Sequence, residues 1–113
     1  MKNIFLFLML VLSIPTQNYE KAIFGLLGTS IEQSLKNHYP SLGPYTKDNI
    51  GGYTHSKIVA IQTEGDILIT VSFETFYGAH NPPYYENIIT YRLSSNGIDE
   101  QSFKQQEIFP PSY

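Results

Sequence analysis

The apolar pattern of the chain changes from a helical period to a strand period at Gly52, and this change limits the fold most strongly. Before it, Ile23, Leu27, Ile31 and Leu35 recur at every fourth position, which places them on one face of an α-helix. After it, apolar and polar residues alternate, as is typical of strands that bury one face. A helix followed by several strands predicts an α+β domain whose helical stripe packs against one face of an antiparallel sheet.

The helical segment from Asn18 to His38 contains two glycines, Gly25 and Gly28. Glycine in a helix interior costs about 1 kcal/mol relative to alanine. The tetrapeptide TSIE that follows Gly28 has the pattern of a capping box, which starts helices. We therefore predict an N-terminal helix broken in two, with one part ending at about Leu27 and the second running from Ser30 to His38.

The second half of the chain predicts a meander of three to four strands after a surface loop at residues 39–52. The expected strands are 53–63, 67–76, 86–94 and a weaker edge strand from Ile98 to about Gln106. In the first strand, simple alternation places Ile58 and Ile61 on opposite faces. In the second, Glu74 belongs to a mostly polar face that we expect to meet water. This order fits a cystatin-like or nuclear-transport-factor-like layout.

The N-terminus has the pattern of a secretory signal peptide. Lys2 precedes an apolar run from Ile4 to Ile14 that ends at Pro15, and this run is shorter than the roughly 20 residues of a membrane-spanning helix. We predict a signal peptide at 1–17 and one domain at 18–113, hence a secreted or cell-surface protein. No small-x-small triplet precedes Tyr19, so an uncleaved N-terminal segment that anchors the chain to the membrane is the alternative.

Charge and cysteine content exclude several classes of partner and cofactor. From Asn18 onward the chain holds six basic and ten acidic residues, and the basic ones are scattered singly, which disfavours nucleic acid as a partner. The chain has no cysteine, so thiol catalysis, cysteine-ligated zinc and iron–sulfur clusters are excluded. The three histidines, His38, His55 and His80, are isolated and show no metal-ligand spacing. We predict no cofactor and no metal.

The most unusual segment connects the second and third predicted strands, from Tyr77 to Tyr85. Pro82 and Pro83 fix φ at successive positions, while Gly78 is free to adopt positive φ where the chain leaves the sheet. We therefore predict a stiff, outward-facing loop.

This segment resembles a known family. The run VSFETFYGAHNPPYYENIITYR, from Val71 to Arg92, is similar to the hallmark of domain-of-unknown-function family 3888, with its Gly-x-His-Asn-Pro-Pro-Tyr core at Gly78 to Tyr84. The resemblance implies a short exported protein of spore-forming Gram-positive bacteria with a signal peptide, a helix and a strand–loop–strand. It implies no activity, because the family has no assigned function.

Each side chain of the loop has a structural and a functional interpretation. His80 and Asn81 either hold the turn through backbone hydrogen bonds or act with Glu74 as a general base with an orienting amide. The tyrosines either pack over the end of the sheet or form an aromatic platform for recognition. Nucleophile motifs such as Gly-x-Ser-x-Gly do not occur in the sequence.

The sequence thus favours a non-catalytic binding module over an enzyme. The expected partner is a protein, a peptide or a cell-wall component, and an inhibitor would use the same kind of loop. The binding candidates are Glu74, Tyr77, His80, Asn81, Pro82, Pro83, Tyr84 and Tyr85. The alternative is a small hydrolase or ligand-processing domain that uses His80, Asn81 and Glu74; a pocket in which they converge would favour it.

Overall fold

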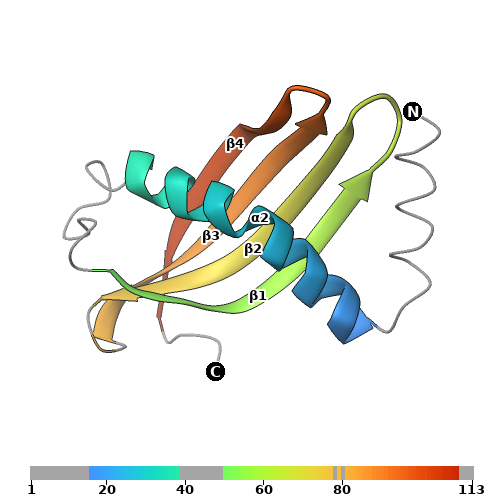
Figure 1. Ribbon diagram of the computed structural model, residues 1–113. Helices are drawn as coiled ribbons and strands as arrows, with labels where there is room; N and C mark the ends of the chain where they lie inside the picture. The colour runs from blue at the N-terminus through green and yellow to red at the C-terminus, as the bar shows by residue number, and fades with distance from the viewer. Residues whose placement is uncertain (1–15, 39–49, 78, 80, 110–113) are drawn as a thin grey trace.

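The domain is an α+β structure with one helix on a four-stranded antiparallel sheet (Figure 1). The computed structural model describes residues 16–38, 50–77, 79 and 81–109, with side chains from residues 18 and 55 onward in the first two ranges. The elements are α2 (Thr16–His38), β1 (Ile50–Gln62), β2 (Ile67–Tyr77), β3 (Asn81–Ser94) and β4 (Gly97–Ile108). The strands lie in the sheet in chain order, so the predicted fold class and the fourth strand are confirmed.

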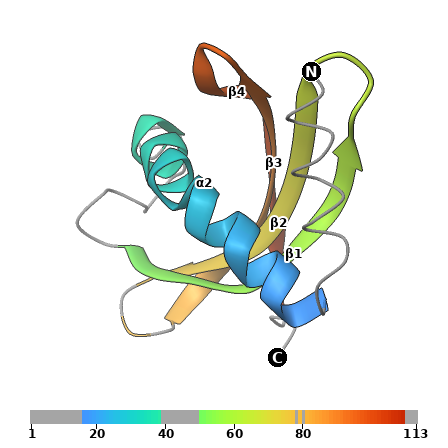
Figure 2. The same cartoon turned by 45° about the vertical axis from the view of Figure 1, so that its right-hand side comes forward.

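The core lies between α2 and the sheet face that the helix crosses (Figure 2). The helical stripe is fully buried there, as its spacing predicts. The sheet contributes alternate residues of its two central strands, which also follows from their period of two. The buried core residues are Ile23, Leu27, Ile31, Leu35, Ile67, Ile69, Val71, Phe73, Ile89 and Tyr91.

The helix is continuous, so the predicted break after Leu27 is wrong. Gly25 and Gly28 both lie inside the 23-residue helix, and the TSIE sequence starts no new one. The two glycines cost about 1 kcal/mol each. Burial of a single leucine or isoleucine side chain contributes about 1.5–3 kcal/mol, and the stripe buries four, so packing outweighs the weak helix propensity.

β1 does not alternate simply, because it contains three irregularities, each with one more residue on β1 than on β2. Val59 is the extra residue between the pairs Ile58–Val71 and Ala60–Thr70. Ile58 and Ile61 consequently both pack against the core, and the prediction that they lie on opposite faces is wrong. A second bulge contains His55, whose φ is 55°. Bulges of this kind twist an edge strand and hinder pairing with other chains.

The second face of β2 is not simply open to water, which corrects a further expectation. Ser72 and Glu74 are buried, with Glu74 only 6% exposed. Both lie on an interior strand, and Glu74 has Thr54 of β1 and Glu86 of β3 directly opposite. The Cβ atoms of directly opposite residues are about 5 Å apart, so the side chain of Glu86 helps to cover Glu74.

A glycine lies in or next to the turn between β1 and β2 and the turn between β3 and β4. Gly65 and Gly97 adopt positive φ values of 74° and 116°, which favour glycine over other residues.

The loop predicted at 39–52 falls mostly outside the described residues, and β1 already begins at Ile50. Residues 1–15 of the predicted signal peptide also lie outside them, while Thr16 and Gln17 belong to α2.

Candidate functional site

The segment predicted as an outward-facing loop from Tyr77 to Tyr85 belongs mostly to the sheet. β2 ends at Tyr77 and β3 already begins at Asn81, five residues earlier than the predicted strand at Glu86. Between the pairs Thr75–Tyr85 and Tyr77–Asn81, β3 has two more residues than β2. This irregularity contains Pro82 and Pro83, joined by a cis peptide bond. Proline is tolerated in strands at such bulges because its missing N–H is not needed for pairing.

The candidate side chains of this segment divide into buried and accessible ones. Tyr84 is buried at 8% exposure, as the packing interpretation of the tyrosines expects for this residue. Asn81 and Pro82 are exposed, and Tyr77, Pro83 and Tyr85 are half-buried. His80 lies outside the described residues.

The end of β4 extends this accessible surface. Ile108 pairs with Tyr84, and Phe109, the next residue, is 83% exposed. Burial, together with the nearby carboxylate of Glu107, raises the pKa of Tyr85 above its ordinary value. We call this surface the motif end; it comprises Tyr77, Ala79, Asn81, Pro82, Pro83, Tyr85 and Phe109.

A buried asparagine fixes the strands just behind the motif end. Asn87 Nδ2 donates to Thr75 Oγ1 at 3.1 Å and to the Phe73 carbonyl at 3.4 Å. Gln105 Nε2 donates to Asn87 Oδ1 at 2.9 Å. The side chain thereby connects β3 to both of its neighbours. The sequence carried a signal for it, since Asn87 is the one polar residue among the inward-facing positions between Tyr85 and Tyr91.

Glu74 lies in a separate hollow on the sheet face opposite the helix. This hollow has a volume of about 330 Å³ and is lined by His55, Ser56, Lys57, Ser72, Glu74 and Glu86. Asn81 is not among these residues, because the register places it opposite Tyr77, three positions beyond Glu74 on β2. The described residues therefore do not bring Asn81 and Glu74 together.

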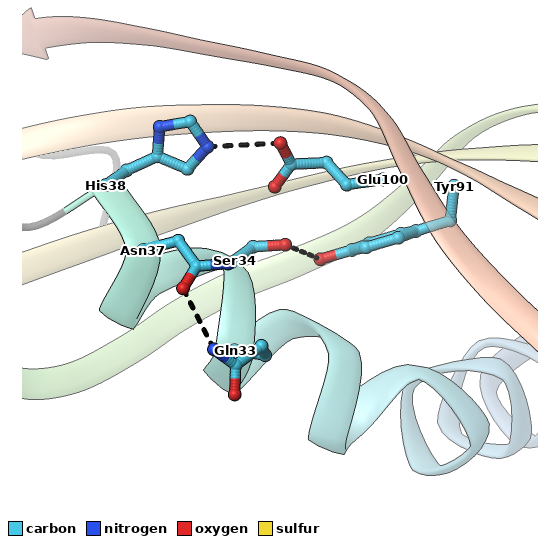
Figure 3. A network of polar contacts seen from close by, with 6 residues as sticks. All are labelled: Gln33, Ser34, Asn37, His38, Tyr91 and Glu100. Carbon is cyan, nitrogen blue, oxygen red and sulfur yellow. Dashed lines mark hydrogen bonds and ion pairs between the residues drawn. The ribbon is translucent and has the colours of Figure 1, made fainter.

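A polar cleft lies between the last turns of α2 and the hairpin of β3 and β4 (Figure 3). At its base the hydroxyls of Ser34 and Tyr91 form a buried hydrogen bond of 2.9 Å. On the helix, Gln33 Nε2 donates to Asn37 Oδ1 at 2.9 Å. We call this site the helix–hairpin cleft; its volume is about 210 Å³ and its lining residues are Ser30, Gln33, Ser34, Asn37, Tyr91, Ile98, Asp99 and Glu100.

His38, the last residue of α2, connects the helix to β4 beside this cleft. Its Nε2 lies 3.1 Å from Glu100 Oε2, and its ring stacks on Phe103 with centroids 3.9 Å apart and an interplanar angle of 11°. Because Ser34 bonds to Tyr91 and His38 bonds to Glu100, these contacts hold helix and sheet together and do not form a nucleophile–base pair.

The family described as "Protein of unknown function (DUF3888)" matches residues 19–107, which span most of α2 and nearly all of the sheet. The chain belongs to the DUF3888 family. The resemblance seen in the sequence is thereby confirmed at the level of the family. Comparison with curated proteins and with solved structures gave no match.

Two further properties of the DUF3888 domain concern only its described residues. Their histidine and carboxylate side chains do not assemble into a group of three or more that could hold a metal ion. Helix α2 lacks a stretch that is long and apolar enough to cross a membrane.

Sequence reasoning missed the helix–hairpin cleft of this DUF3888 domain. It treated His38 as an isolated histidine and did not consider Ser34 or Glu100. A local signal was present, since Gln33 and Asn37 lie four residues apart, as do Ser34 and His38, and residues at this spacing share a helix face. The partners on β3 and β4 had no local signal.

Proposed function

We propose that this DUF3888 domain is an exported, non-catalytic binding module that contacts a protein, peptide or cell-wall partner through the motif end. One observation carries the proposal. The segment that carries the sequence resemblance is anchored on one side by buried Tyr84 and accessible on the other at Asn81 and Pro82. A segment that only closed the end of the sheet would have no need of the accessible side.

The physical character of the motif end suits recognition. Sheet pairing holds Asn81 and Tyr85 in place before any partner arrives, which reduces the entropy lost on binding. Tyr85 and Phe109 add aromatic contact area, and tyrosine combines a large apolar surface with a polar tip. The hydrolase alternative requires Asn81 to converge with Glu74, and the register separates them.

Substitutions at the motif end should weaken partner capture without unfolding the domain. The chain from residue 18 serves as bait for envelope proteins and isolated cell walls of the producing cell. We expect the double variant Phe109→Ala and Pro82→Ala to recover at least about tenfold less of the partner, which corresponds to a loss of about 1.4 kcal/mol in binding free energy. Val59→Ala, at another exposed apolar residue, is the matched control. Melting curves should be the same for all variants. Undiminished recovery by the double variant would refute the proposal.

The export part of the proposal rests on the sequence pattern of residues 1–17. We expect N-terminal sequencing of the protein from the culture medium to give a mature chain that begins near Asn18. Recovery solely from the membrane fraction, with residues 1–17 still attached, would instead support the anchored alternative.

A further inference from the structure

We propose that the helix–hairpin cleft binds a small neutral ligand rich in hydroxyl groups, of the size of one sugar ring. The cleft shares no residue with the motif end, so this site goes beyond the function proposed above. Tyr91 lies near the β3–β4 turn, whereas Asn81 and Pro82 are at the opposite end of the same strand. The two surfaces can therefore be tested independently.

The lining of the cleft consists almost entirely of hydrogen-bonding side chains. Ile98 is the one apolar residue among the eight that line it. Carboxamides from α2 offer both donors and acceptors, the half-buried hydroxyl of Ser30 does the same, and carboxylates from β4 offer acceptors. A ligand with several hydroxyl groups also carries donors and acceptors side by side, and it is therefore complementary to this lining.

The polar groups of the cleft are positioned in advance. Ser34 and Tyr91, both buried, hold each other through their hydroxyls, and Gln33 is bonded to Asn37 (Figure 3). The bond between these two amides uses neither the Gln33 carbonyl nor the Asn37 N–H groups. His38 fixes one oxygen of Glu100, and Figure 3 shows the second oxygen on the side of Asn37 and Ser34. Groups that are already ordered lose little entropy when a ligand binds.

The charges at the cleft favour a neutral ligand. Asp99 and Glu100 line it without any Lys or Arg among the lining residues, which disfavours an anion. An ammonium ligand would have to compete with existing cationic or donor partners, because Arg92 Nη2 lies 3.5 Å from Asp99 and His38 Nε2 lies 3.1 Å from Glu100. A carboxylate that already has one such partner still accepts hydrogen bonds from ligand hydroxyls, and these charge-assisted bonds are stronger than neutral ones.

The size of the cleft limits the ligand. A volume of about 210 Å³ corresponds to about seven water molecules at liquid density. This is below the range of drug-sized pockets, about 300–1,000 Å³. It suits one ring and excludes enclosure of an oligosaccharide, whose further units would lie outside the cleft.

The test is an NMR titration of the ¹⁵N-labelled chain from residue 18 with glucose and N-acetylglucosamine as probes, and with putrescine as the ammonium probe. We expect the two sugars to shift the side-chain amide signals of Gln33 and Asn37 with dissociation constants of about 1–10 mM, as for a small ligand with few contacts. Gln33→Ala and Asn37→Ala should each weaken sugar binding about five- to tenfold, the effect of one lost hydrogen bond.

The matched control is Gln106→Ala, an exposed glutamine on β4 that does not line the cleft, and it should leave the dissociation constants unchanged. Gln33 and Asn37 are exposed, and a melting curve verifies that their variants remain folded. The proposal is overturned if the sugars shift no signal at the cleft, if putrescine alone does so, or if the control weakens binding as much as the cleft variants.

Discussion

Replacing Leu27 with alanine should lower the free energy of unfolding by about 2–5 kcal/mol. Leu27 is fully buried in the middle of the helical stripe, between the turns that hold Ile23 and Ile31. Truncation removes its apolar area from the core and leaves a cavity against the sheet that a close-packed interior fills only in part. A small domain has a total stability of about 5–15 kcal/mol, so a large share of the molecules would unfold at elevated temperature.

The neighbouring leucine supplies the control for this prediction. Leu26 is 46% exposed and points away from the core, so Leu26→Ala should change stability by less than about 1 kcal/mol. Urea unfolding followed by circular dichroism gives both values from the midpoint and slope. Equal losses for the two variants would mean that α2 does not pack on the sheet through the stripe.

The sequence predicted the helix well where one physical effect dominated and poorly where two competed. The stripe identified the face that packs, because burial of apolar side chains is the dominant driving force of folding. The predicted break was wrong because helix propensity and capping signals are local. The packing that overrides them at Gly25 and Gly28 depends on a sheet whose residues lie much later in the sequence.

The strands show the same limit in another form. Alternation predicted the buried face of β2 because that strand runs without interruption through the core. It failed in β1, where the extra residue Val59 places Ile58 and Ile61 on one face, and at the start of β3. A bulge reverses the alternation, and neither glycine nor proline marks the one at Val59 in the sequence.

The candidate sites were only partly accessible to sequence reasoning. The segment from Gly78 to Tyr84 stands out in the sequence, but the sequence does not indicate which of its tyrosines is buried, and the structure buries Tyr84 while Tyr85 is half-buried. The four-residue spacings on the helix side of the helix–hairpin cleft can be seen in the sequence, but the contacts that join this side to the sheet connect residues 57 and 62 positions apart. Contacts of such separation leave no local pattern for the sequence to reveal.

Replacing Asn87 with alanine should destabilise the domain by about 2–4 kcal/mol and loosen the motif end. The change removes three hydrogen bonds and leaves the buried Thr75 hydroxyl without this donor. Each buried polar group that loses its partner costs about 1–3 kcal/mol. Gln105 is half-buried and can reach water, so we expect most of the loss to come from the contacts with β2.

The location of the effect distinguishes this role from a general loss of core packing. In native-state hydrogen exchange, the variant should accelerate the exchange of the Tyr84 and Tyr85 amides more than that of the Tyr91 amide. The lost bonds join β3 to β2 and β4 at Asn87, which is nearer to Tyr84 and Tyr85 than to Tyr91. Asn81→Ala, at an exposed asparagine on the same strand, should leave both rates unchanged. Uniformly faster exchange along β3 would show instead that Asn87 stabilises the whole sheet. Other contacts would then have to hold the motif end in place.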